Sequence, residues 1–279
     1  NLCAKALKKK LVQAEKSGEL PKVVIPVHLA GQPCDMKAIF ALSEEYGFKI
    51  IEDASHAIGG KYLGEPIGCC TYSEITVFSF HPVKIITTGE GGMALTNSPV
   101  LAERMSLLSS HGITRDPNQM THSSDGEWYY QQIELGFNYR ITEMQAALGL
   151  SQLERVDYYV TRRHEQAARY NELLKGFKLV RPCQHDDGYS AFHLYIIRLE
   201  DQKKHRAVFE YLRKEGIGVN LHYIPVHTQP YYQQTTVTFT NLTQAEEYYK
   251  EAISLPLHPN MTDVEQDFVI SSLRKALQE

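Results

Sequence analysis

Apolar runs separated by an amphipathic segment dominate the first part of the chain. Apolar runs at 23–27, 48–51 and 75–80 predict three buried strands. Between the first two runs, Asp35 is placed to cap a helix that extends to Tyr46. A strand–helix–strand unit usually joins parallel strands, because the helix returns the chain to the same end of the sheet. The pattern therefore predicts an α/β fold with a mostly parallel sheet.

The remaining pattern predicts a second, smaller domain. We place the boundary near residue 151, which gives a partial large domain at 1–150 and a smaller C-terminal α+β domain at 151–279. The box Thr142-x-x-Gln145 opens one long helix towards Leu174. Other expected elements are helices at 2–16, 100–108, 207–214 and after Asp263, strands at 93–96, 195–199 and 216–223, and a long ordered loop at 112–139.

Composition and charge exclude several classes of protein. Of the 279 residues, 43% are hydrophobic and 22% are charged, which is typical of a globular chain and not of a disordered one. The formal charge is −4 and the basic residues form no block, so we expect no nucleic-acid partner. No apolar run reaches the roughly 18–20 residues of a membrane helix. The first ten residues also lack the apolar core of a secretory signal.

The five cysteines indicate a reducing environment. They stand at Cys3, Cys34, Cys69, Cys70 and Cys183, an odd number with two adjacent members. This spacing builds neither a disulfide framework nor a zinc site of paired C-x-x-C motifs. We therefore expect a cytoplasmic protein.

The first candidate for chemistry is a carboxylate at the end of a strand. Asp53 stands two residues after the apolar run at 48–51, where the expected strand ends. In open α/β sheets ligands bind at the carboxyl ends of the strands, so this position suits a functional residue. The alternative is that Asp53 only caps the following turn.

A second candidate site follows the next strand. Ser79, His81 and Lys84 lie within six residues, and the glycines of Gly89-Glu90-Gly91-Gly92 come after them. A lysine there can form a Schiff base with a carbonyl cofactor if its surroundings lower its pKa. The alternative is a solvent-facing loop lysine. Pyridoxal phosphate enzymes need such a lysine together with an acidic partner for the pyridine nitrogen. Lys84 and Asp53 together therefore indicate this class of enzyme more strongly than either residue alone.

These motifs resemble a known enzyme family. The stretches IIEDASHAIGG (50–60), TVFSFHPVKIITTGEGG (76–92) and LGFNYRITEMQAALG (135–149) are similar to the DegT/DnrJ/EryC1 family of sugar aminotransferases. The resemblance covers nearly the whole chain. It implies the fold-type-I, aspartate-aminotransferase-like fold and pyridoxal 5′-phosphate (PLP/PMP) as the cofactor. The segments VVIPVHLAGQPCDM (23–36) and GIGVNLHYIPVHTQPYY (216–232) look most like the branch of the family that serves pseudaminic acid biosynthesis.

The resemblance implies a role for each cofactor-binding residue. Lys84 would bind the cofactor aldehyde and carry the proton between Cα and C4′. Asp53 would keep the pyridine nitrogen protonated, and His56 would pack beside the ring. Ser79 would donate a hydrogen bond to the cofactor phosphate.

The resemblance also implies partners and substrate contacts. Asn138 would reach the phosphate in a neighbouring subunit, so that two chains form a homodimer with shared active sites. Arg140 would support that loop and, with His222, Tyr223 and His227, would line the substrate site. The substrates would be an amino acid donor, by family habit L-glutamate, and C4 of a UDP-linked 4-keto-6-deoxy-N-acetylhexosamine.

Several simpler interpretations stay open. His28 is more typical of a satisfied core histidine than of a catalyst, and Trp128 with its tyrosine neighbours serves either as a substrate platform or as loop packing. His222 and His227 are five residues apart and straddle a proline, so we expect no metal site.

Two rival functions are a sugar dehydratase of the same family and a non-catalytic interaction module. In the dehydratases a histidine replaces the lysine, so Lys84 argues against the first rival. Family members carry a longer N-terminal segment with a phosphate-binding turn and a ring-stacking aromatic residue. We therefore expect these 279 residues alone to be cofactor-free or only weakly loaded, and inactive.

Overall fold

The computed structural model describes residues 1–235 and 242–278, which form two units. Unit 1 comprises Asn1–Leu29 and Pro33–Val156, and unit 2 comprises Ala30–Gln32 and Asp157–Glu279. The change of unit at Val156 follows the expected boundary near residue 151 by a few residues. The inclusion of Ala30–Gln32 in unit 2 has no counterpart in the sequence pattern.

A four-stranded sheet forms the centre of unit 1. Its strands are β1 (Val23–Val24), β2 (Lys49–Asp53), β5 (Ile75–Ser79) and β6 (Gly92–Leu95), in the spatial order β1-β2-β5-β6. The first three are parallel and β6 runs antiparallel to β5. The predicted mostly parallel α/β sheet is therefore confirmed, although the first strand is much shorter than the apolar run at 23–27.

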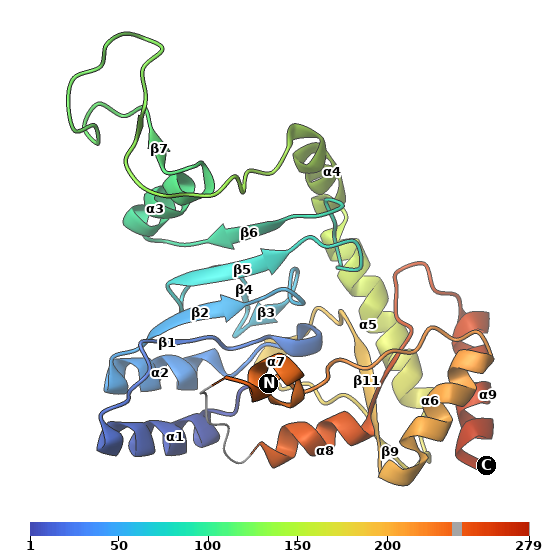
Figure 1. The fold of residues 1–279 in the computed structure, drawn as a ribbon. Coiled ribbons are helices and arrows are strands. Elements are labelled where there is room, and N and C mark those ends of the chain that lie inside the picture. The colour runs from blue at the N-terminus through green and yellow to red at the C-terminus, as the bar shows by residue number, and fades with distance from the viewer. Residues whose placement is uncertain (236–241, 279) are drawn as a thin grey trace. The chain divides into compact units, whose positions relative to one another are not determined.

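Two helices flank the β1–β2 side of this sheet. Figure 1 shows α1 (Ala4–Ser17) and α2 (Met36–Tyr46) side by side next to β1 and β2. Asp35 caps α2, as its position predicts, because its Oδ1 accepts a hydrogen bond from the Ala38 N–H at 3.2 Å. Gly47 ends the helix in the left-handed region, with φ of 77°.

The two faces of the sheet have different surroundings. In β2 and β5, Glu52, Thr76 and Phe78 are buried, whereas Asp53 and Ser79 are partly exposed. Successive side chains of a strand point to opposite faces, so the neighbouring carboxylates Glu52 and Asp53 are separated by the sheet. The face that carries Asp53 is the open one.

The rest of unit 1 lies between β2 and β5 or beyond β6 along the chain. Its elements are the hairpin β3 (Lys61–Tyr62) and β4 (Glu65–Pro66), then α3 (Pro99–Ser109), β7 (Ile113–Thr114), β8 (Gln131–Gln132) and α4 (Glu143–Leu153). The expected long loop is present and contains one short antiparallel pair, β7 with β8. Figure 1 shows this loop projecting away from the sheet beyond α3.

Unit 2 is built around the antiparallel sheet β12-β11-β9 and packs helices against it. Its core includes Tyr170, Ile197, Leu212, Ile253 and Leu273, all fully buried. The elements are α5 (Val156–Leu173), β9 (Leu179–Val180), β10 (Gly188–Tyr189), β11 (Tyr195–Leu199), α6 (His205–Lys214), α7 (Pro230–Gln233), α8 (Thr243–Glu251), β12 (Ala252–Leu255) and α9 (Asp263–Gln278), with 3₁₀ turns at Leu29–Gly31, Gln202–Lys204 and Val226–Thr228. This is the expected α+β arrangement.

Two sequence-based expectations are wrong. The helix that begins with the Thr142–Gln145 capping box is interrupted after Leu153, because the chain turns there and passes from unit 1 to unit 2. The segment 216–223 is not a strand. Gly216, with φ of 80°, ends α6, and a tight Val219 N–H to Ile217 O contact then curls the backbone, so that Asn220 alone bridges to Ser254.

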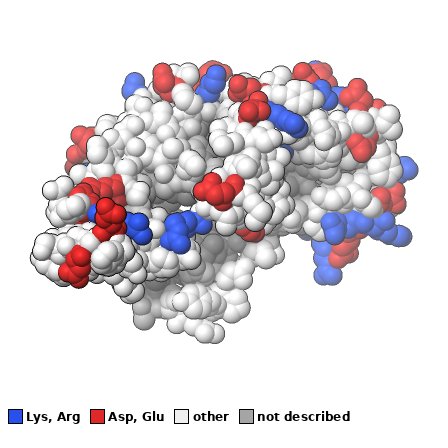
Figure 2. Space-filling view, turned by 90° about the horizontal axis from the view of Figure 1, so that it is seen from above, with Lys and Arg blue, Asp and Glu red and all other residues white. Residues whose placement is uncertain are grey.

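Charged side chains of both signs are interspersed on the face of the molecule shown in Figure 2. No helix within residues 1–235 and 242–278 is long and apolar enough to cross a membrane.

Leu212→Ala is expected to lower the free energy of unfolding of unit 2 by about 2–5 kcal/mol, because it leaves a cavity in a fully buried position. Val264→Ala is a matched control on an exposed position and should change it by less than about 0.5 kcal/mol. Urea unfolding of both variants measures the difference. Equal midpoints would show that Leu212 does not belong to the core.

Candidate active site

The strand ends of β2 and β5 bring the first two candidate segments together. In the parallel register Asp53 pairs with Val77, and Ser79 follows two residues later on the same face. Lys84 is half-buried in the bend that follows β5. The carboxyl ends of parallel strands meet at one edge of a sheet, so the carboxylate, hydroxyl and amine share that edge.

Lys84 and Asp53 interact electrostatically. Burial lowers the pKa of the Lys84 amine below its ordinary value, and the negative charge of Asp53 opposes this shift. Nζ makes no hydrogen bond to any residue that the structure describes. A partly desolvated amine with a lowered pKa is neutral more often than a surface lysine, and only the neutral amine can act as a nucleophile or accept a proton.

Backbone hydrogen bonds hold Asp53 at the end of β2. Its N–H donates to Pro26 O at 2.9 Å, and its carbonyl accepts from the His28 N–H at 3.0 Å. The Ser55 N–H donates to Oδ1 at 3.0 Å. The second carboxylate oxygen meets no donor in the described part of the chain, so it is available to a ligand N–H.

The loop that carries Lys84 is closed by its own hydrogen bonds. Phe80 O accepts from Thr87 Oγ1 at 2.9 Å and from the Thr88 N–H at 3.1 Å, while the Phe80 N–H donates to Gly91 O at 2.8 Å. A side chain at Gly92 would lie 2.8 Å from Phe78 O, so glycine permits the close pairing of β6 with β5 there. These hydrogen bonds therefore fix the backbone of the loop that carries Lys84.

The other two cofactor candidates flank this edge. His56 is 6% exposed in the turn after β2. Ser79 Oγ accepts a hydrogen bond from the His81 N–H at 3.4 Å, which leaves its hydroxyl hydrogen able to donate elsewhere.

Asn138 and Arg140 lie on a strap of unit 1 that is bound to the end of α3. The backbone of Phe137 and Tyr139 bonds to Leu108, Ser109 and His111, and Arg140 Nη1 donates to Ser110 Oγ at 3.1 Å. Asn138 is exposed. It is flanked in sequence by Phe137 and Tyr139, whose rings stack on each other with centroids 4.8 Å apart.

The remaining candidates, His222, Tyr223 and His227, belong to one loop of unit 2. His222 Nδ1 contacts Ser254 Oγ at 2.8 Å, and His227 Nε2 contacts Glu246 Oε1 at 2.9 Å. Burial raises the pKa of Tyr248 to about 12, so its hydroxyl stays protonated and donates to His222 O at 3.0 Å. The loop is thus anchored, and the Tyr223 ring is 52% exposed.

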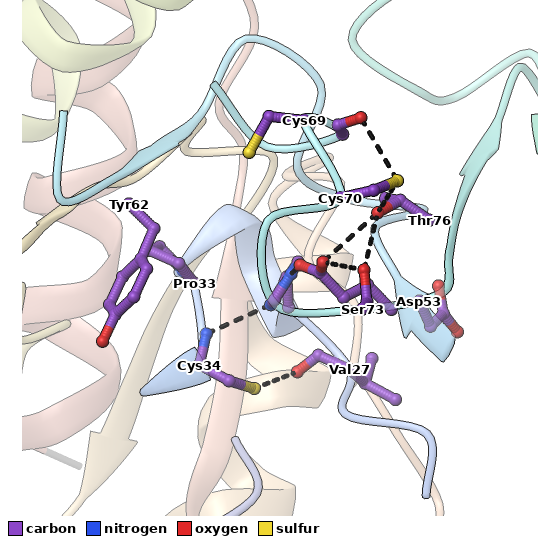
Figure 3. Close-up of polar contacts among 12 residues, drawn as sticks. Val27, Pro33, Cys34, Asp53, Tyr62, Cys69, Cys70, Ser73 and Thr76 are labelled. Carbon is purple, nitrogen blue, oxygen red and sulfur yellow. Dashed lines mark hydrogen bonds and ion pairs between the residues drawn. The ribbon is translucent and has the colours of Figure 1, made fainter. Parts of the chain in front are cut away.

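The sequence pattern does not reveal a buried polar network behind Asp53. His28 is fully buried and contacts the Glu52 carboxylate, so its interpretation as a satisfied core histidine is confirmed. Figure 3 shows the network that continues through Ser73 and Thr76, with the Asp53 side chain turned away from both. The sequence does contain one signal for this network: Glu52 is a charged residue at a position of the strand where the alternation predicts a buried side chain.

Comparison with known proteins places this site in a family. A sequence profile described as the DegT/DnrJ/EryC1/StrS aminotransferase family matches residues 1–274. The spore coat polysaccharide biosynthesis protein SpsC of Bacillus subtilis is 40% identical over 259 residues, which are 91% of this chain and 66% of that protein.

Two solved structures extend the comparison. Helicobacter pylori PseC, an aminotransferase involved in pseudaminic acid biosynthesis, aligns with a TM-score of 0.85 and 30% identity over 93% of this chain and 68% of that one. The PLP form of the sugar aminotransferase Spr1654 from Streptococcus pneumoniae aligns with a TM-score of 0.81 and 30% identity, over 92% of this chain and 68% of that one. The chain therefore belongs to the DegT/DnrJ/EryC1/StrS aminotransferase family.

Proposed function

We propose that this sugar aminotransferase, whose cofactor is pyridoxal phosphate, transfers an amino group from L-glutamate to C4 of a UDP-linked 4-keto-6-deoxy-N-acetylhexosamine. Similarity to PseC and to SpsC supports a role in nucleotide-sugar biosynthesis of the pseudaminic acid type. All five cysteines are free thiols, which favours a reducing compartment such as the cytoplasm.

The residues at the sheet edge fit the needs of this cofactor. It requires an amine for its aldehyde, a carboxylate for its ring nitrogen and donors for its phosphate. Lys84 supplies an amine with a lowered pKa, and Asp53 supplies a free carboxylate oxygen. Ser79 supplies a hydroxyl on the same face. The electrostatic interaction of Lys84 with Asp53 at one strand edge is the observation that carries the proposal.

Asp53 and Lys84 have different roles in the proposed reaction. The bound cofactor supplies the carbonyl group and an electron-withdrawing ring. The Asp53 carboxylate would accept a charge-assisted hydrogen bond from the ring nitrogen and so hold its proton there. The Lys84 amine would hold the cofactor and, once released, would take the proton from the donor's Cα and return it at C4′ of the cofactor, on the other side of the linking nitrogen. Burial lowers the pKa of this amine and so favours the neutral form, which can accept that proton.

We assign cofactor binding to the first domain, 1–150, and sugar contacts to the second, 151–279. His56 packs beside the cofactor ring in this proposal. The anchored loop with His222, Tyr223 and His227 suits a polar sugar nucleotide because it offers two imidazoles beside an exposed ring. Aromatic rings of this kind stack on bases and sugars.

We also propose a homodimer in which the Asn138 strap of one subunit completes the site of the other, with Arg140 supporting the strap and contacting the substrate. The long loop and α4 expose many large apolar side chains, more than a monomer usually leaves in water. These are Trp128, Tyr130, Leu135, Phe137, Tyr139, Met144, Leu148, Leu150 and Leu153, each at least 42% exposed. A second copy covers this surface in the proposed assembly.

Lys84→Ala is expected to abolish the visible absorbance of bound pyridoxal phosphate, because the covalent bond to the aldehyde is lost. Borohydride reduction followed by peptide mass spectrometry should label Lys84 in the wild type in preference to other lysines. Lys37→Ala serves as a control on α2 and should keep the absorbance. A retained band in Lys84→Ala would contradict the assignment.

The proposed transfer is tested with ¹⁵N-labelled L-glutamate and the UDP-4-keto sugar. Saturating cofactor and an excess of enzyme over sugar make slow transfer measurable. The label should appear on C4 of the sugar product by mass spectrometry and NMR. Transfer that persists in Lys84→Ala, or an enzyme that deoxygenates the sugar without amination, would overturn the proposal.

The dimer is tested by light scattering after gel filtration. The wild type should have twice the chain mass of 31.8 kDa, and Leu135→Lys with Met144→Lys should yield a folded monomer because the charges cannot be buried. Val264→Lys, equally exposed in unit 2, should remain dimeric. A monomeric wild type would refute the shared site.

A further inference from the structure

Glu52 lies in the buried layer of the sheet, directly beside Asp53 in sequence and on the opposite face. It is 5% exposed. Its Oε1 accepts hydrogen bonds from Ser73 Oγ at 2.5 Å and from Thr76 Oγ1 at 3.3 Å, and its Oε2 contacts His28 Nε2 at 2.7 Å. Figure 3 shows Ser73 and Thr76 converging on this point. A buried carboxylate with three donors is a fully satisfied group.

These donors keep Glu52 ionised. Burial opposes the charge, but the hydrogen bonds from His28, Ser73 and Thr76 hold the pKa of Glu52 below its ordinary value. The Glu52 carboxylate favours a proton on the His28 ring, whereas the Cys34 N–H, 3.1 Å from Nδ1, needs a lone pair there. Burial lowers the pKa of His28, but its contacts with Cys34 and Glu52 raise it to about 9. The geometry nevertheless requires a ring that keeps the lone pair on Nδ1 and donates its Nε2 proton to Glu52, because the Cys34 N–H points at Nδ1.

His28 joins this network to Asp53. Its ring is fixed by Glu52 on one side and by the Cys34 N–H on the other. Its main-chain N–H donates to the carbonyl of Asp53 at 3.0 Å, and the Asp53 N–H donates to Pro26 O at 2.9 Å. The main chain around His28 therefore hydrogen-bonds to both the N–H and the carbonyl of Asp53. The Glu52 carboxylate in turn fixes the His28 ring.

We propose that the buried Glu52–His28 pair is a positioning device that sets the place and angle of the Asp53 carboxylate. The proposal rests on the proposed function, in which Asp53 meets the cofactor's ring nitrogen. Neither Glu52 nor His28 touches the cofactor, because Glu52 lies on the other face of the sheet and His28 is fully buried. Small displacements of a positioned group cost large factors in binding and rate, so a rigid support is valuable there.

The first experiment measures the dissociation constant of pyridoxal phosphate for a set of variants. Glu52→Leu removes the acceptors and should weaken binding about tenfold, a size typical of coupled neighbours. Glu52→Gln keeps an oxygen for the His28 N–H and should restore binding to within about threefold. His28→Asn is a milder second variant, since its amide oxygen can still accept from Cys34 but cannot reach Glu52.

A double-mutant cycle separates positioning from general stability. In an Asp53→Asn background, His28→Asn should no longer weaken cofactor binding, because it acts through the Asp53 carboxylate. Tyr62→Phe is the matched control. It removes the partly buried bond from Tyr62 to Asp35 in the same unit and should leave binding within about twofold. Equal losses in both backgrounds, or an equal loss in Tyr62→Phe, would overturn the positioning role.

Amide hydrogen exchange on the cofactor-free protein gives a second, independent readout. His28→Asn should speed exchange of the His28 and Asp53 amides, whose bonds the network supports, while Tyr62→Phe should not. Unchanged exchange at these amides would refute the proposal. A wild type that binds no cofactor even when it is added in large excess would instead refute the proposed function, and exchange would still decide the positioning role.

Discussion

The parallel pairing of β2 with β5 decides where the chemistry of this protein is located. With Asp53 opposite Val77, the acidic end of β2 and the lysine loop after β5 come to one edge of the sheet. The same register sends Glu52 into the buried layer and leaves Asp53 on the open face. A slip of one residue would exchange the two carboxylates between faces. The apolar pattern of β2 fixes the register and therefore also fixes which carboxylate lies on the open face.

Local sequence signals predict much of this arrangement. The apolar runs of β2 and β5, the cap at Asp35 and the box at Thr142 mark strands and helix starts that form as expected, because each depends on neighbours within a few residues. The strand ends at Asp53 and Lys84 also follow from the order of elements alone. Their roles came from the resemblance of the surrounding motifs to a family, to which the chain indeed belongs.

Other features depend on contacts between residues far apart in sequence. The periodic pattern runs on past Leu153 and gives no sign of the break between α4 and α5, which accompanies a change of unit. Ile217 and Val219 are buried, as their apolar side chains predict, but their backbone pairs with no strand. The bond between His28 and Glu52 joins residues 24 positions apart, so no local pattern predicts it.

Nitrogen-15 NMR of pyridoxal phosphate labelled at its ring nitrogen tests most directly whether Asp53 forms the cofactor site with Lys84. When the labelled cofactor is bound to the wild type at neutral pH, the ring nitrogen should be protonated, because the nearby carboxylate stabilises the pyridinium charge. In Asp53→Asn the bound nitrogen should lose its proton at the same pH. A nitrogen that is unprotonated in the wild type, or equally protonated in both proteins, would contradict this account.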